Sequence, residues 1–398
     1  ESMKVYPCPY EANCKNTSGA TGQSLCQEGS GGALCSVCDR DYYLHAPSGG
    51  KGGCVACSEG KPWLGPVVGL VVVLILGAAF AVYKAKFRAF LARNRAFLAR
   101  NRELLSKVKQ NLFLFLVALQ IITVLKTNHD SLDGAQTMAE PYETFLAASS
   151  VVDLDIAQIL PLNCLSESPM NHLDVLLMTT LVPPGVALVL LFIVFVLKRG
   201  NKAAFEYNFV QVLLFSYPAI SRTICQSFRC SSFNDGTDEG ALFLTADMSI
   251  GCKGDTYSGM TAYASLCVLI YSVGIPLFLW LKLFKWRREL NPPGYEDEDR
   301  AIKARMRNKK MLADPLVSFA IRLRPHQWWY EVYTLAKRFA LTSLVLAFPT
   351  LESYTVYVLA VAVCALLLDR EWASHIDKTV SSFNHALNVQ VLLAPLVC

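Results

Sequence analysis

Cysteines are the residues of this sequence whose type and spacing point most directly to chemistry. The spacing Cys35-x2-Cys38, fifteen residues, then Cys54-x2-Cys57 fits a four-cysteine zinc ribbon. The same spacing also occurs in disulfide-stapled modules outside the cell. Seven glycines between Gly29 and Gly53 suit loops held by bridges, and they favour the disulfide alternative. We therefore expect no metal and no cofactor.

Three further cysteines lie in acidic segments between apolar runs, which makes ten on the predicted oxidising side of a membrane. The seven before residue 60 cannot all pair with one another, so we expect one to reach Cys164. Cys230 and Cys252 are expected to pair across their own segment. A glycosylation sequon begins at Asn16. The predicted disulfide cysteines are Cys8, Cys14, Cys26, Cys35, Cys38, Cys54, Cys57, Cys164, Cys230 and Cys252.

Ionisable residues inside apolar runs are the second set of candidates, because a charge in hydrocarbon is costly and marks a function or a partner. Glu331 and Arg338 are seven apart, so they share a helix face but lie about 10 Å apart along its axis, too far to pair directly. Ion conduction, proton relay and structural ion pairing between helices remain open. The candidates for an intramembrane or pore charge are Asp174, Arg222, Glu331, Lys337 and Arg338.

The elements that must position these residues are long apolar runs. The chain is 53% hydrophobic and 17% charged, which is too apolar for an ordinary soluble domain. Each run approaches the roughly 20 residues that span a bilayer, and 380–398 reads as the start of a further helix. The sequence therefore predicts an all-α polytopic helix bundle of seven or eight spans. The runs are 63–83, 111–125, 173–197, 205–225, 257–284, 328–349 and 353–368.

Charge alternates between the segments that join the runs, and this predicts their sides. Segment 84–110 holds nine Lys or Arg and one acid, whereas 126–172 holds seven acids and one Lys. Because Lys and Arg accumulate on the cytoplasmic side, the N-terminus is predicted to lie outside the cell. The predicted location of the protein is the plasma or ciliary membrane. The basic residues are thus explained by topology, and no nucleic-acid partner is expected. No signal peptide precedes Cys8, so we expect further chain at both ends.

The predicted organisation begins with an extracellular cysteine-rich module and continues into a membrane bundle. In chain order the parts are the module 1–60, a first span 61–83, a cytoplasmic basic amphipathic helix 84–110 and a transmembrane bundle 111–398, with external loops 126–172 and 226–256 and a cytoplasmic loop 286–327. The external loop 226–256 has room for a pore helix and a turret.

The basic helix 84–110 contains a seven-residue repeat, AFLARNR followed by AFLARNR. A period of seven returns each residue type close to the same helix face, so an apolar arc lies between two rows of Lys and Arg. This arrangement is typical of helices that lie in the membrane interface, where they contact anionic inner-leaflet lipids. A solvated coiled-coil arm and a calmodulin-binding segment are the alternatives. The lipid-facing candidates are Arg93, Arg95, Arg100 and Arg102.

Two resemblances add to this interpretation. The segment GALCSVCDRDYYL with CVAC resembles the cysteine-rich modules of ephrin-receptor-like and EGF-like ectodomains. The segments FSYPAISRTICQSFRC, FLTADMSIGC, YSVGIPLFLW and WWYEVYTLAKRFALT resemble the transmembrane block of large multi-pass surface proteins of algae and protists. That block is likened to polycystin and transient-receptor-potential-type cation channels. The resemblance implies a pore near 205–288, with Gly274 and Pro276 as a candidate hinge.

The sequence contains no phosphate-binding loop, no HExxH motif and no nucleophile elbow, so we expect no enzyme. A cation channel or channel subunit, acting as an oligomer, is one hypothesis. The other is a membrane anchor or receptor for extracellular matrix or glycoprotein that conducts nothing. A transporter is a third, without a visible repeat of span groups. Only about three residues, near Leu351, separate the last two complete runs, which is too short for a pore loop there.

Overall fold

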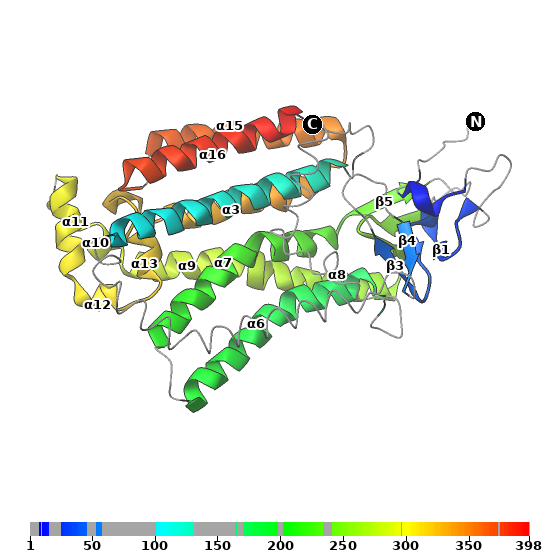
Figure 1. Ribbon diagram of the computed structural model, residues 1–398, viewed down its shortest axis with the longest axis horizontal. Helices are drawn as coiled ribbons and strands as arrows, with labels where there is room; N and C mark the ends of the chain where they lie inside the picture. Colours follow the sequence, from blue (N-terminus) through cyan, green and yellow to red (C-terminus); the bar gives the residue numbers. More distant parts are fainter. Residues whose placement is uncertain are drawn as a thin grey trace. The chain divides into compact units, whose positions relative to one another are not determined.

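The structure is a computed structural model of a mostly helical chain (Figure 1). Contacts divide it into two compact units, one of residues 1–116 and 155–170, the other of 117–154 and 171–398. The predicted first span, the sequon at Asn16 and Arg93, Arg95 and Arg100 lie outside the described residues. The structure describes residues 8, 10–15, 25–45, 53–57, 101–130, 132, 164, 170–197, 202–233, 241–295, 297–372 and 375–397.

The first unit contains a small disulfide-bonded module of short elements. Strand β1 pairs with β2, and β3 pairs with β4, both antiparallel. The buried side chain of Asn13 joins them, because its Nδ2 donates to the Cys35 carbonyl at 2.9 Å and its Oδ1 accepts from the Cys54 amide at 2.7 Å. The elements are η1 (Glu11–Asn13), β1 (Ser30–Gly31), η3 (Ala33–Cys35), β2 (Val37–Cys38), β3 (Tyr42–His45) and β4 (Gly53–Ala56).

Disulfide bonds staple this module, as expected for a segment too small to build a large apolar core. All four cysteines of the zinc-ribbon spacing are in disulfide bonds, so none is left as a thiolate ligand for zinc. Cys38 and Cys54 bond to each other, whereas Cys35 and Cys57 bond to cysteines outside the set. The fourth bond closes the longest loop, with a sequence separation of 107. The pairs are Cys8–Cys14, Cys26–Cys35, Cys38–Cys54 and Cys57–Cys164.

Long helices make up most of the second unit, and they occupy the apolar runs identified in the sequence. Among the described residues, three segments are long and apolar enough to cross a membrane, namely Ser106–His129, Asp255–Lys285 and Leu351–Trp372. Helices α15 and α16 lie side by side and contact each other along their length (Figure 1). The helices are α3 (Arg102–Asp130, which begins in the first unit), α6 (His172–Leu197), α7 (Lys202–Gln226), α8 (Asp255–Cys267), π-helical η6 (Val268–Val273), α9 (Gly274–Lys285), α14 (Tyr330–Thr342), α15 (Leu351–Trp372) and α16 (Lys378–Val397).

The segment 226–256 corrects one expectation, because its described part is a three-stranded antiparallel sheet and contains no pore helix. Strands β5 (Cys230–Phe233), β6 (Ala241–Leu244) and β7 (Asp247–Gly251) pair in that order, and Cys230 bonds to Cys252. Leu244 and Ile250 enter a core shared with α6, α7 and α8. In β7 the buried Ile250 lies between the exposed Ser249 and Gly251, as expected for a strand with one buried face.

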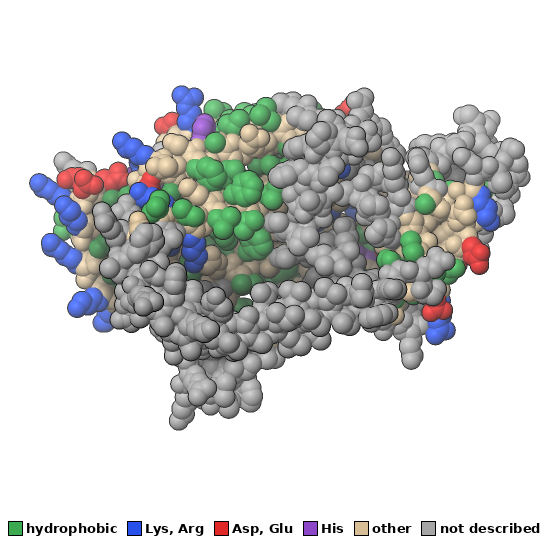
Figure 2. Space-filling view, viewed as in Figure 1, with side chains coloured by type: hydrophobic (Ala, Val, Ile, Leu, Met, Phe, Trp, Pro, Cys, Tyr) green, Lys and Arg blue, Asp and Glu red, His purple; other side chains and the backbone are tan. Residues whose placement is uncertain are grey.

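Short helices connect α9 to α14, and a buried arginine holds this connection together. Arg305 donates from Nη2 to the Ile321 carbonyl at 2.6 Å and from Nη1 to the Leu323 carbonyl at 3.1 Å. Exposed Lys and Arg side chains gather around α11 and α12, next to a hydrophobic face (Figure 2). The connecting elements are α10 (Arg287–Leu290), α11 (Glu298–Arg307), α12 (Lys309–Leu312), α13 (Val317–Ala320) and η7 (Pro325–Gln327), and η8 (Leu344–Ala347) follows α14.

Candidate functional site

A buried ion pair joins two helices of the second unit. Lys337 Nζ on α14 lies 2.8 Å from Asp369 Oδ2 on α15. The side chains of Lys337 and Asp369 are 7% and 0% exposed, so water does not screen their interaction. Removing one partner of such a pair leaves an unpaired buried charge, which costs about 3–5 kcal/mol. The pair therefore fixes α14 against α15.

Neutral polar side chains complete the coordination of the Asp369 carboxylate. Asn388 on α16 donates from Nδ2 to Asp369 Oδ2 at 2.6 Å, while its Oδ1 accepts from Lys337 Nζ at 3.2 Å. Tyr330 donates its hydroxyl to Asp369 Oδ1 at 2.7 Å and accepts from Asn384 Nδ2 at 3.2 Å. Both carboxylate oxygens are thus satisfied by donors from two other helices, α14 and α16. We call these five residues the Asp369 cluster.

The other charged residues of α14 also interact across helices. Arg338 is 3% exposed, and its Nη1 donates to the Leu214 carbonyl on α7 at 3.2 Å. No ion pair between Glu331 and Arg338 occurs among the described residues, in keeping with their separation along the helix. Neighbouring positions 337 and 338 thus tie α14 to opposite partners, α15–α16 on one side and α7 on the other.

A break in the helical hydrogen-bond pattern is the second feature of the unit. The segment Asp255–Lys285 is α-helical at both ends but π-helical at Val268–Val273. Pro276 has no amide hydrogen, so it cannot donate to the Ser272 carbonyl four residues earlier. The Tyr217 hydroxyl on α7 donates to that carbonyl instead, at 2.8 Å. A side chain of one helix therefore replaces a backbone donor of another.

Two further contacts hold this π-helical segment. The Tyr271 hydroxyl donates to the Thr180 carbonyl on α6, and Ser272 Oγ lies 3.3 Å from Ser221 Oγ on α7. A Cβ placed on Gly274 would lie 2.9 Å from the Leu269 carbonyl oxygen, closer than side chains approach. Glycine at 274 is therefore required by the widened turn. The hinge candidates Gly274 and Pro276 lie directly after it.

The remaining sequence candidates have local roles or lie elsewhere. Asp174 forms a capping box at the start of α6, since its Oδ2 accepts from the Asn171 amide at 3.1 Å and its amide donates to Asn171 Oδ1 at 3.2 Å. Arg222 is buried on α7. Arg102 is the first residue of α3. The structure brings none of these three to the Asp369 cluster.

Several residues of both features were not among the sequence candidates. Asp369 directly follows thirteen consecutive apolar residues, 356–368, and an acid at that position was a usable signal. Asn384 and Asn388 are four apart on one face of α16, a spacing that lets both amides join the same polar cluster. Tyr217 carried no sequence signal as a donor, because its acceptor lies 55 residues away.

The chemistry available in this unit is that of interhelical polar contacts. The Asp369 cluster locks α14, α15 and α16, and the Tyr217–Ser272 hydrogen bond connects α7 to the π-helical break. These two sets of contacts are the observations from which a function can be argued. Comparison of the chain with protein-family models, with curated proteins and with solved structures finds no match.

Proposed function

We propose that this chain is a multi-pass cell-surface membrane protein that acts as a cation channel or channel subunit of the polycystin and transient-receptor-potential type. The observation that carries the proposal is the π-helical break in Asp255–Lys285, a segment long and apolar enough to span a membrane. π-Helical turns inside α-helices are frequently functional. This one is held by a hydrogen bond that can open without unfolding either helix.

The break supports a gating role because the helices on its two sides do not share all their partners. Helix α8 packs against α6 and α7, whereas α9 packs against α14 and α7. The Tyr217 hydroxyl and Ser221 hold the break itself to α7, and Tyr271 holds it to α6. If the Tyr217–Ser272 bond opens, α9 can rotate about Gly274 while α8 remains packed against α6 and α7. Hinges of this kind absorb a backbone change at a few residues and move a whole helix.

The proposed topology has seven or eight spans with the N-terminus outside. Support comes from the disulfides, which belong in an oxidising compartment. One bond joins Cys57 of the N-terminal module to Cys164 in the first acidic segment, and the other joins Cys230 to Cys252 in the second. The basic connection 286–327 then lies in the cytoplasm. In this topology the few residues between α14 and α15 leave no room for a pore loop, so the ion path is proposed between subunits of an oligomer.

Planar-bilayer recording of the purified protein tests conduction. We expect cation currents from the wild-type protein and a changed open probability in Tyr217→Phe, which frees the Ser272 carbonyl. Tyr357→Phe is the matched control, because the Tyr357 hydroxyl also donates to a backbone carbonyl, that of Ala340 at 3.2 Å, but away from the break. A silent bilayer, or equal open probability in both variants, contradicts the proposal.

An anchor or receptor for extracellular glycoprotein is the second candidate, and the Asp369 cluster favours it. A carboxylate satisfied by Lys337, Asn388 and Tyr330 is typical of a closed, static bundle. On this proposal the disulfide module binds the partner and the bundle only holds it in place. Binding of a matrix glycoprotein that is lost on reduction of the disulfides, together with a silent bilayer, supports this candidate over the channel.

Anionic inner-leaflet lipids are the proposed partner of the basic helix 84–110. Liposome flotation of the protein with a phosphatidylserine-containing membrane should fall when Arg93, Arg95, Arg100 and Arg102 are replaced by Gln. Each basic residue near an anionic surface contributes about 1 kcal/mol, so the combined loss should be large. Unchanged flotation contradicts a lipid role for this helix.

A further inference from the structure

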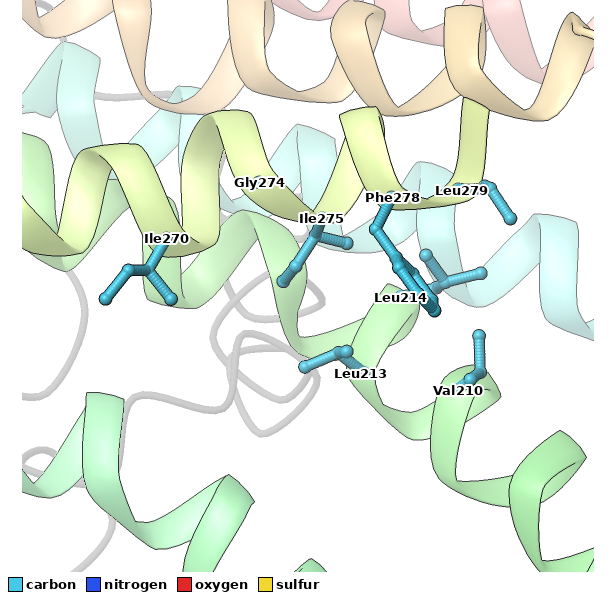
Figure 3. A pocket seen from close by; sticks show the side chains of 8 residues that line it. All are labelled: Val210, Leu213, Leu214, Ile270, Gly274, Ile275, Phe278 and Leu279. Atoms are coloured by element: carbon cyan, nitrogen blue, oxygen red, sulfur yellow. The ribbon is translucent and has the colours of Figure 1, made fainter. Parts of the chain in front are cut away.

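A groove in the second unit runs between α7 and the helix that follows the π-helical break (Figure 3). Its cavity has a volume of about 220 Å³. Ile270 and Phe278 are 53% and 50% exposed, so the groove opens to the outside of the bundle. Its lining is entirely apolar, and consists of Val210, Leu213, Leu214, Ile270, Gly274, Ile275, Phe278 and Leu279.

The size and lining of the groove indicate what kind of ligand it accepts. Pockets that enclose drug-sized ligands measure roughly 300–1,000 Å³ and include a few convergent polar groups. This groove is smaller and presents no polar side chain. It lies along a helix apolar enough to span a membrane, so hydrocarbon and not water surrounds it in a bilayer. A single flexible hydrocarbon chain matches these properties.

Two lysines lie just beyond one end of the groove. Lys282 Nζ lies 5.7 Å from the centre of the Phe278 ring, which is itself part of the lining. Lys285 Nζ, one turn further, lies 5.4 Å from the centre of the Trp286 ring. Both lysines are exposed, and neither has an ion-pair partner among the residues that the structure describes. Their position after an apolar span is that of the phospholipid headgroups.

Nearby acids do not neutralise these lysines in the described structure. Asp314 Oδ2 accepts from Trp286 Nε1 at 3.1 Å, which fixes the indole beside Lys285. Arg287 packs on the Phe284 ring at 3.8 Å and donates to the Phe284 carbonyl. The helix end therefore presents two exposed cations next to an indole ring held by Asp314, and an anionic group is the complement they lack.

We propose that this groove binds one acyl chain of an anionic glycerophospholipid, whose phosphate lies between Lys282 and Lys285. The chain then packs against Gly274 and Ile275, the first residues after the π-helical break. With Lys282 and Lys285 on the cytoplasmic side, the lipid comes from the inner leaflet, where anionic lipids are enriched. The choice of leaflet rests on the proposed topology, whereas the binding does not.

Tryptophan quenching by chain-brominated lipids tests the proposal. The protein is reconstituted in phosphatidylcholine nanodiscs with a small fraction of either brominated phosphatidylglycerol or brominated phosphatidylcholine. Trp280, which follows the lining residue Leu279 in the chain and stacks on Phe284, serves as reporter with Trp286. We expect stronger quenching by phosphatidylglycerol at equal fractions. Glycerol phosphate, which carries the charge without the chains, should not displace it.

Variants separate the headgroup from the chain. Lys282→Gln and Lys285→Gln should each reduce the preference for phosphatidylglycerol about fivefold, the factor expected for one basic residue at an anionic surface. Val210→Phe fills the groove and should abolish the selective quenching. Val212→Phe is its matched control, because Val212 is 60% exposed on the same helix, α7, but does not line the groove.

Equal quenching by the two lipids overturns the proposal. So does a preference for phosphatidylglycerol that survives both lysine substitutions, or selective quenching that survives Val210→Phe. Competition by glycerol phosphate as strong as that by the intact lipid also overturns it, because the chain then contributes nothing. The lysine variants change exposed side chains only, so they report even if the groove variant fails to fold. The measurement needs no current, so its failure is distinct from a failure of conduction.

Discussion

Lys337 and Asp369 form a buried ion pair 32 residues apart in sequence, with Nζ and Oδ2 separated by 2.8 Å. Each is followed in the chain by an arginine. Arg338 donates to a backbone carbonyl on α7, and Arg370 lies in the last turn of α15. The pair thus connects the α15–α16 hairpin to the helix that also contacts the π-helical part of the bundle through α7. This continuity makes the pair the place to test how rigidly the bundle is held.

Lys337→Met should destabilise the protein by about 3–5 kcal/mol, because Asp369 is left as an unpaired buried charge. The double variant Lys337→Met with Asp369→Leu should recover most of this loss. Arg300→Met is the control, since Arg300 and Asp297 form an exposed pair whose side chains are 77% and 55% exposed. Such pairs contribute about 0–1 kcal/mol. The measurement is unfolding in detergent, and additive losses in the double variant would contradict this role of the pair.

His375 should make stability depend on pH. The pKa of His375 is lowered to about 4, chiefly by burial; Asp369 and Asp377 oppose this shift, and Arg322 and Lys337 contribute to it. The unfolded state therefore binds a proton at higher pH than the folded state does. The contribution is complete above about pH 6.5 and is lost as the pH falls towards 4.

The effect can be isolated with His375→Gln. The wild-type protein should lose about 3 kcal/mol more than the variant between pH 6.5 and 4, since each unit of pKa corresponds to about 1.4 kcal/mol. Thermal unfolding in detergent across this range measures the difference. Parallel curves for the two proteins would show that the pKa of His375 is the same in the folded and the unfolded protein, which contradicts the prediction.

The positions of the long helices could be predicted from the sequence, whereas the contacts between them could not. An apolar run of bilayer length must satisfy its own backbone, so the segment around 353–368 had to be a helix. No local pattern shows that Lys337 pairs with Asp369, because that choice depends on how α14 packs against α15. The same limit applies to Pro276, which marks a break in the helix but does not show that Tyr217 satisfies the freed carbonyl.

The segment 226–256 shows where the length of a segment misled the prediction. Thirty residues between two spans have room for a helix, and the resemblance to channels favoured one. The described residues form β5, β6 and β7, closed by the Cys230–Cys252 bond. Strands of about four residues have too few positions to show the alternating pattern that distinguishes a strand from a loop. Which strands pair depends on the Cys230–Cys252 disulfide and on the burial of Leu244.

Tyr217→Phe should destabilise the bundle by about 1–3 kcal/mol, the cost of leaving a buried carbonyl without a donor. Tyr217 is 1% exposed, so water does not reach the Ser272 carbonyl to replace the lost hydroxyl. Tyr357→Phe should cost less, because Tyr357 is only half-buried and water can more readily replace its hydroxyl at the Ala340 carbonyl. Equal losses in the two variants would show that burial does not set the cost of the lost hydroxyl.

Gly274→Ala and Gly259→Ala should have opposite effects on stability, although both glycines lie in Asp255–Lys285. At Gly259 an added methyl group meets nothing within 4 Å, so Ala should stabilise the helix by about 0.5–1 kcal/mol through its higher helix propensity. At Gly274 the methyl group would lie 2.9 Å from the Leu269 carbonyl oxygen, an atom of the backbone that cannot move without changing the turn.

The Gly274 variant must therefore either lose the π-helical turn or strain it, and overpacking of this kind costs typically about 1–3 kcal/mol. If the π-helical turn is lost, the part of the helix on one side of it shifts by one residue relative to α7, and the Ser272 carbonyl moves away from the Tyr217 hydroxyl. Adding Tyr217→Phe to Gly274→Ala should then cost little, because the hydrogen bond is already broken. Thermal unfolding of the two single variants and the double variant measures this coupling. Fully additive losses would show that the turn and the Tyr217 hydrogen bond are independent.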